Sequence, residues 1–170
     1  MINILKKKKG FTLVELLATI TILGIIMLIA VPNVINIINN NKKTTYIEDA
    51  KRLVALAEAK FRSDGSFIRP KHTMDCTEIY LSDLDKSTLS EAPEGGTYDE
   101  TASYVVVKYD AVKGYQYMVQ LKEVYGTDNN NYRGIPCINS SSLDESDAMH
   151  KYVKTTGFVA ANTGANCAIW

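Results

Sequence analysis

The chain begins with a basic stretch, continues into a long apolar segment and then changes to a mixed apolar and polar pattern. Residues 16–38 carry no charged side chain, and four lysines, Lys6, Lys7, Lys8 and Lys9, precede them. An apolar segment of about 20 residues is long enough to cross the hydrocarbon core of a bilayer. Lysines on one side hold that end in the cytoplasm. The pattern therefore predicts one membrane-spanning helix with a cytoplasmic N-terminus.

Glu15 is a charged residue just inside this apolar segment. An ionised carboxylate at membrane depth costs up to roughly 2.5–3.5 kcal/mol, so it suggests a partner. If the chain is cut between Gly10 and Phe11, the new amine of Phe11 lies one helical turn before Glu15, on the same face. The same amine on a neighbouring copy serves equally well. In a medium of low dielectric this attraction favours lateral assembly with a defined axial stagger.

These residues resemble the class III prepilin leader and mature start of type IV pilins and pseudopilins, with matches at Gly10, Phe11 and Glu15. The resemblance implies that a prepilin peptidase cuts after Gly10, that Phe11 is N-methylated and that Glu15 guides subunit docking. The short leader and the lysine, isoleucine and asparagine content suit a Gram-positive bacterium. An ordinary secretory signal or a simple membrane anchor is the alternative. A secretory signal is cut after its apolar run, where residues 28–32 lack an A-x-A-like pair, and a plain anchor needs neither Gly10 nor Glu15.

Two residues inside the apolar segment weaken a helix. Gly24 and Pro32 cost a soluble helix about 1 and about 3 kcal/mol, respectively. Pro32 also leaves the carbonyl four residues earlier without its donor. We therefore expect the helix to kink or yield between Gly24 and Pro32, and the resemblance implies melting in this region of an assembled filament. A static kink is the alternative.

Beyond the apolar segment we expect an amphipathic helix over residues 39–64, because apolar side chains recur there at helical spacing. The apolar positions are Tyr46, Ala50, Leu53, Val54, Ala57 and Phe61, and the expected solvated positions are Glu48, Asp49, Lys51, Arg52, Glu58 and Lys60. Residues 63–65 provide a stop. An unbroken helix over residues 11–63 would be about 80 Å long. In the alternative, the asparagine run at 39–41 separates a short anchor from a second helix.

The second half of the chain changes to a strand pattern. Residues 103–109 and 114–121 are rich in β-branched and aromatic side chains, and the short segment between them fits a hairpin. Residues 152–154 and 158–160 are weaker strand candidates. We therefore expect an α+β fold, in which a long N-terminal α-helix packs on an antiparallel sheet of about three or four strands. This architecture resembles the pilin head.

The remaining segments predict loops and complete the domain organisation. Residues 66–100 are typical of an irregular connector, and residues 126–147 are polar and turn-rich. In pilins the corresponding regions are variable surface loops, which implies subunit or partner contacts there, with plain solvated loops as the alternative. The expected organisation is a leader at 1–10, an apolar transmembrane and filament-core helix at 11–38, an amphipathic helix at 39–64 and a globular head at 65–170.

Three cysteines lie outside the apolar segment, where an oxidising compartment would permit disulfides. Only one intramolecular pair can form. By the resemblance to pilins, many of which have a C-terminal disulfide, Cys137 and Cys167 are the expected pair and Cys76 is left over. Such a bridge contributes roughly 3–4 kcal/mol in the chain-entropy model. A bridge from Cys76 to either partner, or three buried thiols, are the alternatives.

Neither metal binding nor catalysis is indicated. Three residues of types that bind metals, His72, Asp75 and Cys76, lie within five positions of one another. Cys137, His150 and Cys167 are further candidate ligands, far away in the sequence. No C-x-x-C or H-x-x-x-H spacing supports a zinc site, and the common catalytic motifs are missing from the sequence. Removal of the four leader lysines leaves 15 basic and 19 acidic residues, so nucleic acid is not an indicated partner. We expect no cofactor, no metal and no enzymatic activity.

The resemblance implies a precursor that crosses the cytoplasmic membrane once, is cleaved, and is polymerised into an extracellular pilus, alone or with other pilins. The implied partners are the prepilin peptidase, the pilus assembly machinery and the membrane before assembly. Adhesion, motility and DNA uptake are all compatible outcomes for a major or minor subunit. One alternative is a pseudopilin of a type II secretion or competence system. The alternative of another class is a membrane-anchored adhesin or binding module that never polymerises.

Overall fold

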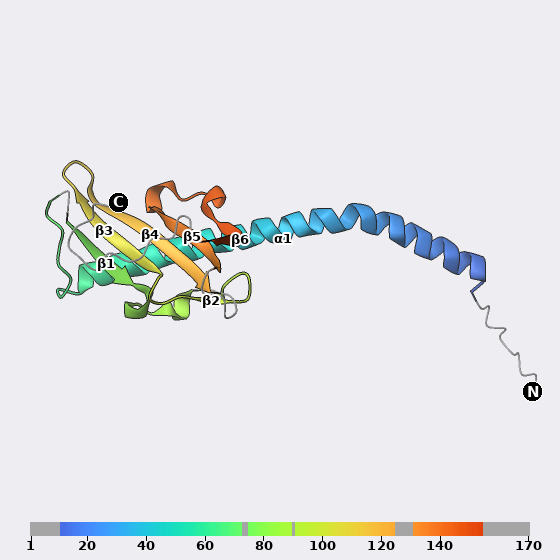
Figure 1. Ribbon diagram of the computed structural model, residues 1–170, viewed down its shortest axis with the longest axis horizontal. Coiled ribbons are helices and arrows are strands. Elements are labelled where there is room, and N and C mark those ends of the chain that lie inside the picture. The colour runs from blue at the N-terminus through green and yellow to red at the C-terminus, as the bar shows by residue number, and fades with distance from the viewer. Residues whose placement is uncertain (1–10, 73–74, 90, 125–130, 155–170) are drawn as a thin grey trace, which may run out of the picture. The chain divides into compact units, whose positions relative to one another are not determined.

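The computed structural model describes residues 11–72, 75–89, 91–124 and 131–154. Its elements are helix α1 (Leu13–Ser63), strands β1 (Cys76–Tyr80), β2 (Thr97–Tyr98), β3 (Tyr104–Asp110), β4 (Gly114–Val124), β5 (Asn131–Asn139) and β6 (Met149–Lys154), and the short 3-10 helices η1 (Leu81–Asp83), η2 (Lys86–Thr88), η3 (Ser140–Ser142) and η4 (Glu145–Asp147). The predicted α+β fold is confirmed, because one long N-terminal helix packs on a small antiparallel sheet (Figure 1). The chain divides into two compact units, Met1–Ile38 and Asn39–Trp170, and α1 contributes to both.

Helix α1 is continuous through the asparagine run at 39–41. Asparagine weakens a helix because its side chain competes for backbone hydrogen bonds. Here the hydroxyls of Thr44 and Thr45 donate to the carbonyls of Asn40 and Asn41, at 3.1 and 2.9 Å, one turn before the helix enters the core. Tertiary packing from Tyr46 onward then holds the following turns. The alternative of an anchor followed by a separate helix is therefore wrong.

The amphipathic half of α1 buries the predicted stripe and, in addition, Ile47 and Asp49. Its buried residues are Tyr46, Ile47, Asp49, Ala50, Leu53, Ala57 and Phe61, while Val54 is partly buried against the same cluster. Asp49 was expected on the solvated face and is fully buried. Position 49 lies one turn from both Tyr46 and Leu53, so helical geometry places it on the inner face whatever its charge.

The sheet has the strand order β1-β3-β4-β5-β6, with β2 paired to β4 beyond the end of β3. The β3–β4 hairpin is confirmed, with registers from Tyr104 opposite Gln120 to Asp110 opposite Gly114. Among the described residues the sheet contains six strands, so the expected three or four is too few. Strand β6 contains the predicted residues 152–154, whereas the candidate at 158–160 lies outside the described residues.

Three of the strands lie in segments that were expected to be irregular. Strands β1 and β2 belong to the connector, and β5 lies within the turn-rich region. The sequence of β5 hides its strand because it contains Gly134 and Pro136, both unfavourable in a sheet interior. Gly134 has φ 119°, and a Cβ there would approach the carbonyl oxygen of Leu121 to 2.0 Å. The register shifts between Val119 and Leu121, so Pro136 falls in a bulge rather than in the regular ladder.

The two faces of the sheet bury different residues. Val105 and Val107 of β3 face α1 and belong to the main core, together with Leu53, Phe61 and other residues of the helix. Alternation along the strand turns Tyr104 and Val106 to the opposite face, where both are fully buried. The partly buried residues around them are Cys76, Tyr80, Met118 and Cys137. The helix therefore covers one face of the sheet, and a smaller cluster forms on the other.

Candidate functional site

The first turn of α1 is closed by a reciprocal pair, Thr12 and Glu15. The backbone N–H and the hydroxyl of Thr12 donate to Oε2 of Glu15, at 2.8 and 2.9 Å, and the N–H of Glu15 donates to the Thr12 hydroxyl at 3.3 Å. This is a capping box, which satisfies amide groups that the start of a helix leaves without partners. The Thr-x-x-Glu spacing is visible in the sequence and was missed. Glu15 is thus held by its own helix in the single chain.

The predicted cleavage and docking residues lie at this end of the helix. Phe11 and Glu15 are both exposed, and Phe11 precedes Glu15 by four residues. Gly10 and the leader residues Lys6, Lys7, Lys8 and Lys9 lie outside the described residues. The contact between an amine of Phe11 and the Glu15 carboxylate stays a prediction, because it requires a cut chain.

The apolar half of α1 is an exposed surface within the part of the chain that the structure describes. Its large apolar side chains, from Phe11 to Ile38, are 47–85% exposed. One helix of the described residues is long and apolar enough to cross a membrane, with a mean hydropathy of 2.6, and this is α1. Such a surface in water would cost a large free energy, so it requires either lipid or the apolar helices of other subunits.

Polar side chains inside the apolar half bond to their own helix. The hydroxyls of Thr19 and Thr21 donate to the carbonyls three residues earlier, both at 2.8 Å, and the Asn33 amide donates to the carbonyl of Ile29 at 3.0 Å. A helix in hydrocarbon needs this, because no water is present to satisfy polar groups. The helix runs through both Gly24 and Pro32, so the expected melting between them stays a prediction for the assembled state.

A half-buried carboxylate, that of Glu94, joins the start of the amphipathic half of α1 to the sheet. Lys42 Nζ of α1 lies 2.6 Å from Glu94 Oε2, and Arg133 Nη1 of β5 lies 3.1 Å from the same oxygen. The side chain of Glu94 is only 10% exposed. Two cations on one carboxylate compensate for the loss of its hydration. Glu94 thereby links a helix, a connector loop and a strand.

Two further carboxylates lie fully buried beside this link. The Tyr46 hydroxyl donates to Glu123 Oε2, and the Gly96 N–H donates to Glu123 Oε1 at 2.8 Å. The Tyr98 hydroxyl donates to Asp49 Oδ2 at 2.8 Å. Burial, together with the adjacent carboxylates, raises the pKa of Tyr46 and the pKa of Tyr98, so both phenols remain hydrogen-bond donors at neutral pH. Side chains of α1 and of the β2–β4 region therefore interlock at this end of the head.

The cysteines do not follow the expected pairing. Cys137 in β5 has a free thiol, and burial raises its pKa to about 12. Cys76 in β1 is disulfide-bonded. The predicted Cys137–Cys167 bridge is therefore wrong for Cys137, whose side chain packs against the buried Tyr104 and Val106. Cys167 lies outside the described residues.

His72 and Asp75, which were weighed as metal ligands, form an exposed pair with Nδ1 and Oδ2 3.1 Å apart. Across the described side chains, no three His, Cys, Asp or Glu residues come together to hold a metal ion. The site that the structure offers is therefore the apolar helix with its capped carboxylate.

Comparison with known proteins agrees with this geometry. Residues 5–31 match the family model of the prokaryotic N-terminal methylation motif. The match supports the type IV pilin and pseudopilin family. With its class III leader and apolar helix, the chain fits a membrane-anchored, pilin-like or pseudopilin precursor, and the motif implies processing by a prepilin peptidase and assembly into pili. No curated protein and no solved structure matches the chain.

Proposed function

We propose that this chain is a pilus subunit, major or minor, that is cleaved between Gly10 and Phe11, methylated at Phe11 and polymerised into a surface filament through α1. The filament would serve adhesion, motility or related surface functions. The observation that carries the proposal is the apolar half of α1, whose side chains from Phe11 to Ile38 are left exposed by the described part of the chain. Lipid covers them in the precursor, and neighbouring helices cover them in the filament.

The Glu15 carboxylate would fix the axial stagger between neighbouring helices. Cleavage creates a cation at Phe11, and a neighbouring copy can present that cation to Glu15. In a medium of low dielectric, opposite charges a few ångströms apart attract strongly, so one axial stagger between helices is favoured over others. The capping box holds the Glu15 carboxylate against the helix start until that partner arrives.

Mass spectrometry of the protein from cells, before and after leader processing, tests the cleavage step. The proposal expects a mature chain that begins at a methylated Phe11. A filament subunit that retains residues 1–10 would contradict it.

Glu15→Ala tests the docking step. The variant should insert into the membrane as the wild type does but should not enter sheared filaments, as measured by immunoblot of the membrane and filament fractions. Glu48→Ala is the matched control, because Glu48 is an exposed carboxylate on the same helix outside the apolar half. Normal incorporation of Glu15→Ala would refute the docking role, and a wild-type chain found only as single molecules in the membrane would favour the non-polymerising adhesin.

A further inference from the structure

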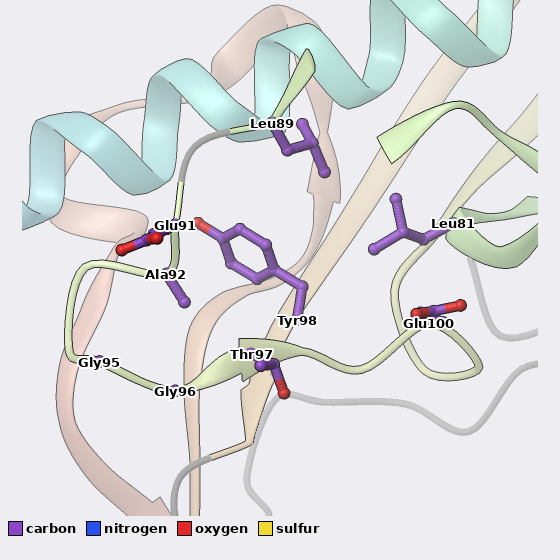
Figure 2. Close-up of a pocket in the computed structure, with 9 residues that line it drawn as sticks. All are labelled: Leu81, Leu89, Glu91, Ala92, Gly95, Gly96, Thr97, Tyr98 and Glu100. Carbon is purple, nitrogen blue, oxygen red and sulfur yellow. The ribbon is translucent and has the colours of Figure 1, made fainter. Parts of the chain in front are cut away.

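A pocket of about 480 Å³ lies in the connector between β1 and β3. Its apolar wall consists of Leu81, Leu89, Ala92 and Tyr98. Glu91 and Glu100 also line the pocket and give it negative charge. In Figure 2 the Tyr98 ring lies at the centre of this connector pocket, with Glu91 and Glu100 on opposite sides. Its volume falls within the roughly 300–1,000 Å³ of ligand pockets.

The connector pocket is acidic at its rim, and its central ring is held in place. The Tyr98 ring is held by the bond from its hydroxyl to Asp49 of α1. Glu91 and Glu100 are both exposed. The described residues that line the pocket include no cation. A suitable occupant therefore combines an apolar side chain with a positive charge.

The tip of the β3–β4 hairpin has this combination. Val112 is 94% exposed, and the adjacent Lys113 is also exposed. The Asp110 carboxylate accepts the N–H groups of both Val112 and Lys113, each at 2.8 Å, and Gly114 follows with φ 74°. The turn is thus locked by its own hydrogen bonds. An ordered tip loses little conformational entropy when it binds.

The tip of a chain cannot reach the connector pocket of the same chain. The tip adjoins Gly114 at the start of β4, whereas β2, which contains pocket residues Thr97 and Tyr98, pairs with the other end of β4 at Val124 and Glu123. These ends are about 33 Å apart at 3.3 Å per residue. Figure 1 shows the hairpin tip and β2 at opposite ends of β4.

We propose that the hairpin tip of one head, Val112 and Lys113, inserts into the connector pocket of a second copy. Val112 then packs against the apolar wall, and the Lys113 ammonium pairs with the carboxylate of Glu91 at the rim. Because tip and pocket are different surfaces, each joined pair retains one unused tip and one unused pocket. Contacts of this kind form open chains rather than closed dimers. The inference rests on the proposed function, since it names a head-to-head contact within the same filament.

A cysteine pair tests the contact in assembled filaments. Val112→Cys and Thr97→Cys, introduced together in the full chain, place one thiol at the tip and one on an exposed residue of the pocket. Mild oxidation of intact filaments should give dimers and higher ladders on a non-reducing gel. Each single variant reveals any contribution of Cys137, and Lys51→Cys with Thr97→Cys is the matched control on an exposed position of α1. Ladders in the control and the test pair alike would count against the contact.

A charge exchange tests it independently. Lys113→Glu should reduce filament yield about three- to tenfold, because it places like charges together at the contact. Glu91→Lys combined with Lys113→Glu should restore much of the yield. Lys113→Glu lies at an exposed turn, so its effect does not require misfolding of the head.

The outcomes separate the two proposals. Normal filaments without tip-to-pocket ladders, and with an unchanged yield for Lys113→Glu, would overturn this contact and leave the proposed function standing. A wild-type chain that forms no filaments would overturn the proposed function and this contact with it.

Discussion

The hydrogen bond from Tyr46 to Glu123 is the most informative single contact to remove, because both side chains are fully buried. Tyr46→Phe keeps the ring and deletes only the hydroxyl. A hydrogen bond to a charged group contributes about 1.5–3 kcal/mol, and a buried carboxylate oxygen without its donor adds a further cost. We therefore expect the free energy of unfolding of the head to fall by about 2–4 kcal/mol. The unfolding temperature should then fall by roughly 6–16 °C.

Thermal unfolding of the full-length protein in detergent, followed by near-ultraviolet circular dichroism, measures this change. Tyr115→Phe is the matched control, since Tyr115 is 37% exposed and its ring contacts with Phe61 and Tyr109 do not need the hydroxyl. The control should change the free energy of unfolding by less than about 0.5 kcal/mol.

A second variant identifies the cause. Glu123→Gln removes the charge but keeps an oxygen that can accept the N–H of Gly96. Combined with Tyr46→Phe, it should recover about 1–2 kcal/mol relative to Tyr46→Phe alone, because a neutral amide costs less to bury than a carboxylate. If the free energy of unfolding of Tyr46→Phe lies within about 0.5 kcal/mol of the wild-type value, the buried Glu123 carboxylate does not depend on the Tyr46 hydroxyl for its stability.

Three further predictions concern the sheet, the tyrosines and the cysteines. Gly134→Ala should destabilise the head by about 3 kcal/mol or more in denaturant unfolding, because φ is 119° and a β4 carbonyl oxygen blocks the Cβ; Gly65→Ala, with open space around it, should change little. The stability contributed by the neutral tyrosines should be fully present below the unfolded tyrosine pKa of about 10. It should be lost as pH rises through the raised pKa values of the folded state, about 12 for Tyr80. Tyrosinate absorbance and circular dichroism, recorded together, measure this loss. Peptide mapping without reduction should find Cys76 bridged to the cysteine near the C-terminus and Cys137 as a free thiol that reacts only after unfolding; Cys137 in a bridge would contradict this.

Elements with a strong local pattern could be predicted from the sequence. The β3–β4 hairpin follows from two strand-like runs joined by a short turn, and the buried stripe of α1 follows from helical spacing. The capping box was equally visible, since Thr12 and Glu15 stand three residues apart. The charge of Glu15 predicts a partner cation, and the local Thr12 bonds come from its spacing instead.

Other features depend on contacts that one segment does not contain. Helical spacing places Asp49 on the inner face, and the hydroxyl that bonds its carboxylate there comes from Tyr98, far along the chain. Strand β5 forms because β4 pairs with it and a bulge accommodates Pro136. The free thiol of Cys137 depends on which sheet face β5 turns outward, and a hydrophobicity pattern does not specify that. The sequence alone therefore predicted the helix and the hairpin better than the connector and the C-terminal half.

The interlocked carboxylates have a mechanical consequence for a fibre. The links from α1 through Lys42, Tyr46 and Asp49 fall within the first three turns of the head unit, which begins at Asn39. When tension is applied to a polymer held together by its helices, the load enters each head at these turns. Shear is then borne by ion pairs and phenol bonds before the hydrophobic core beneath Leu53 and Phe61 has to deform. Resistance to traction would thus depend first on these three links, of which Tyr46 also contributes to thermal stability.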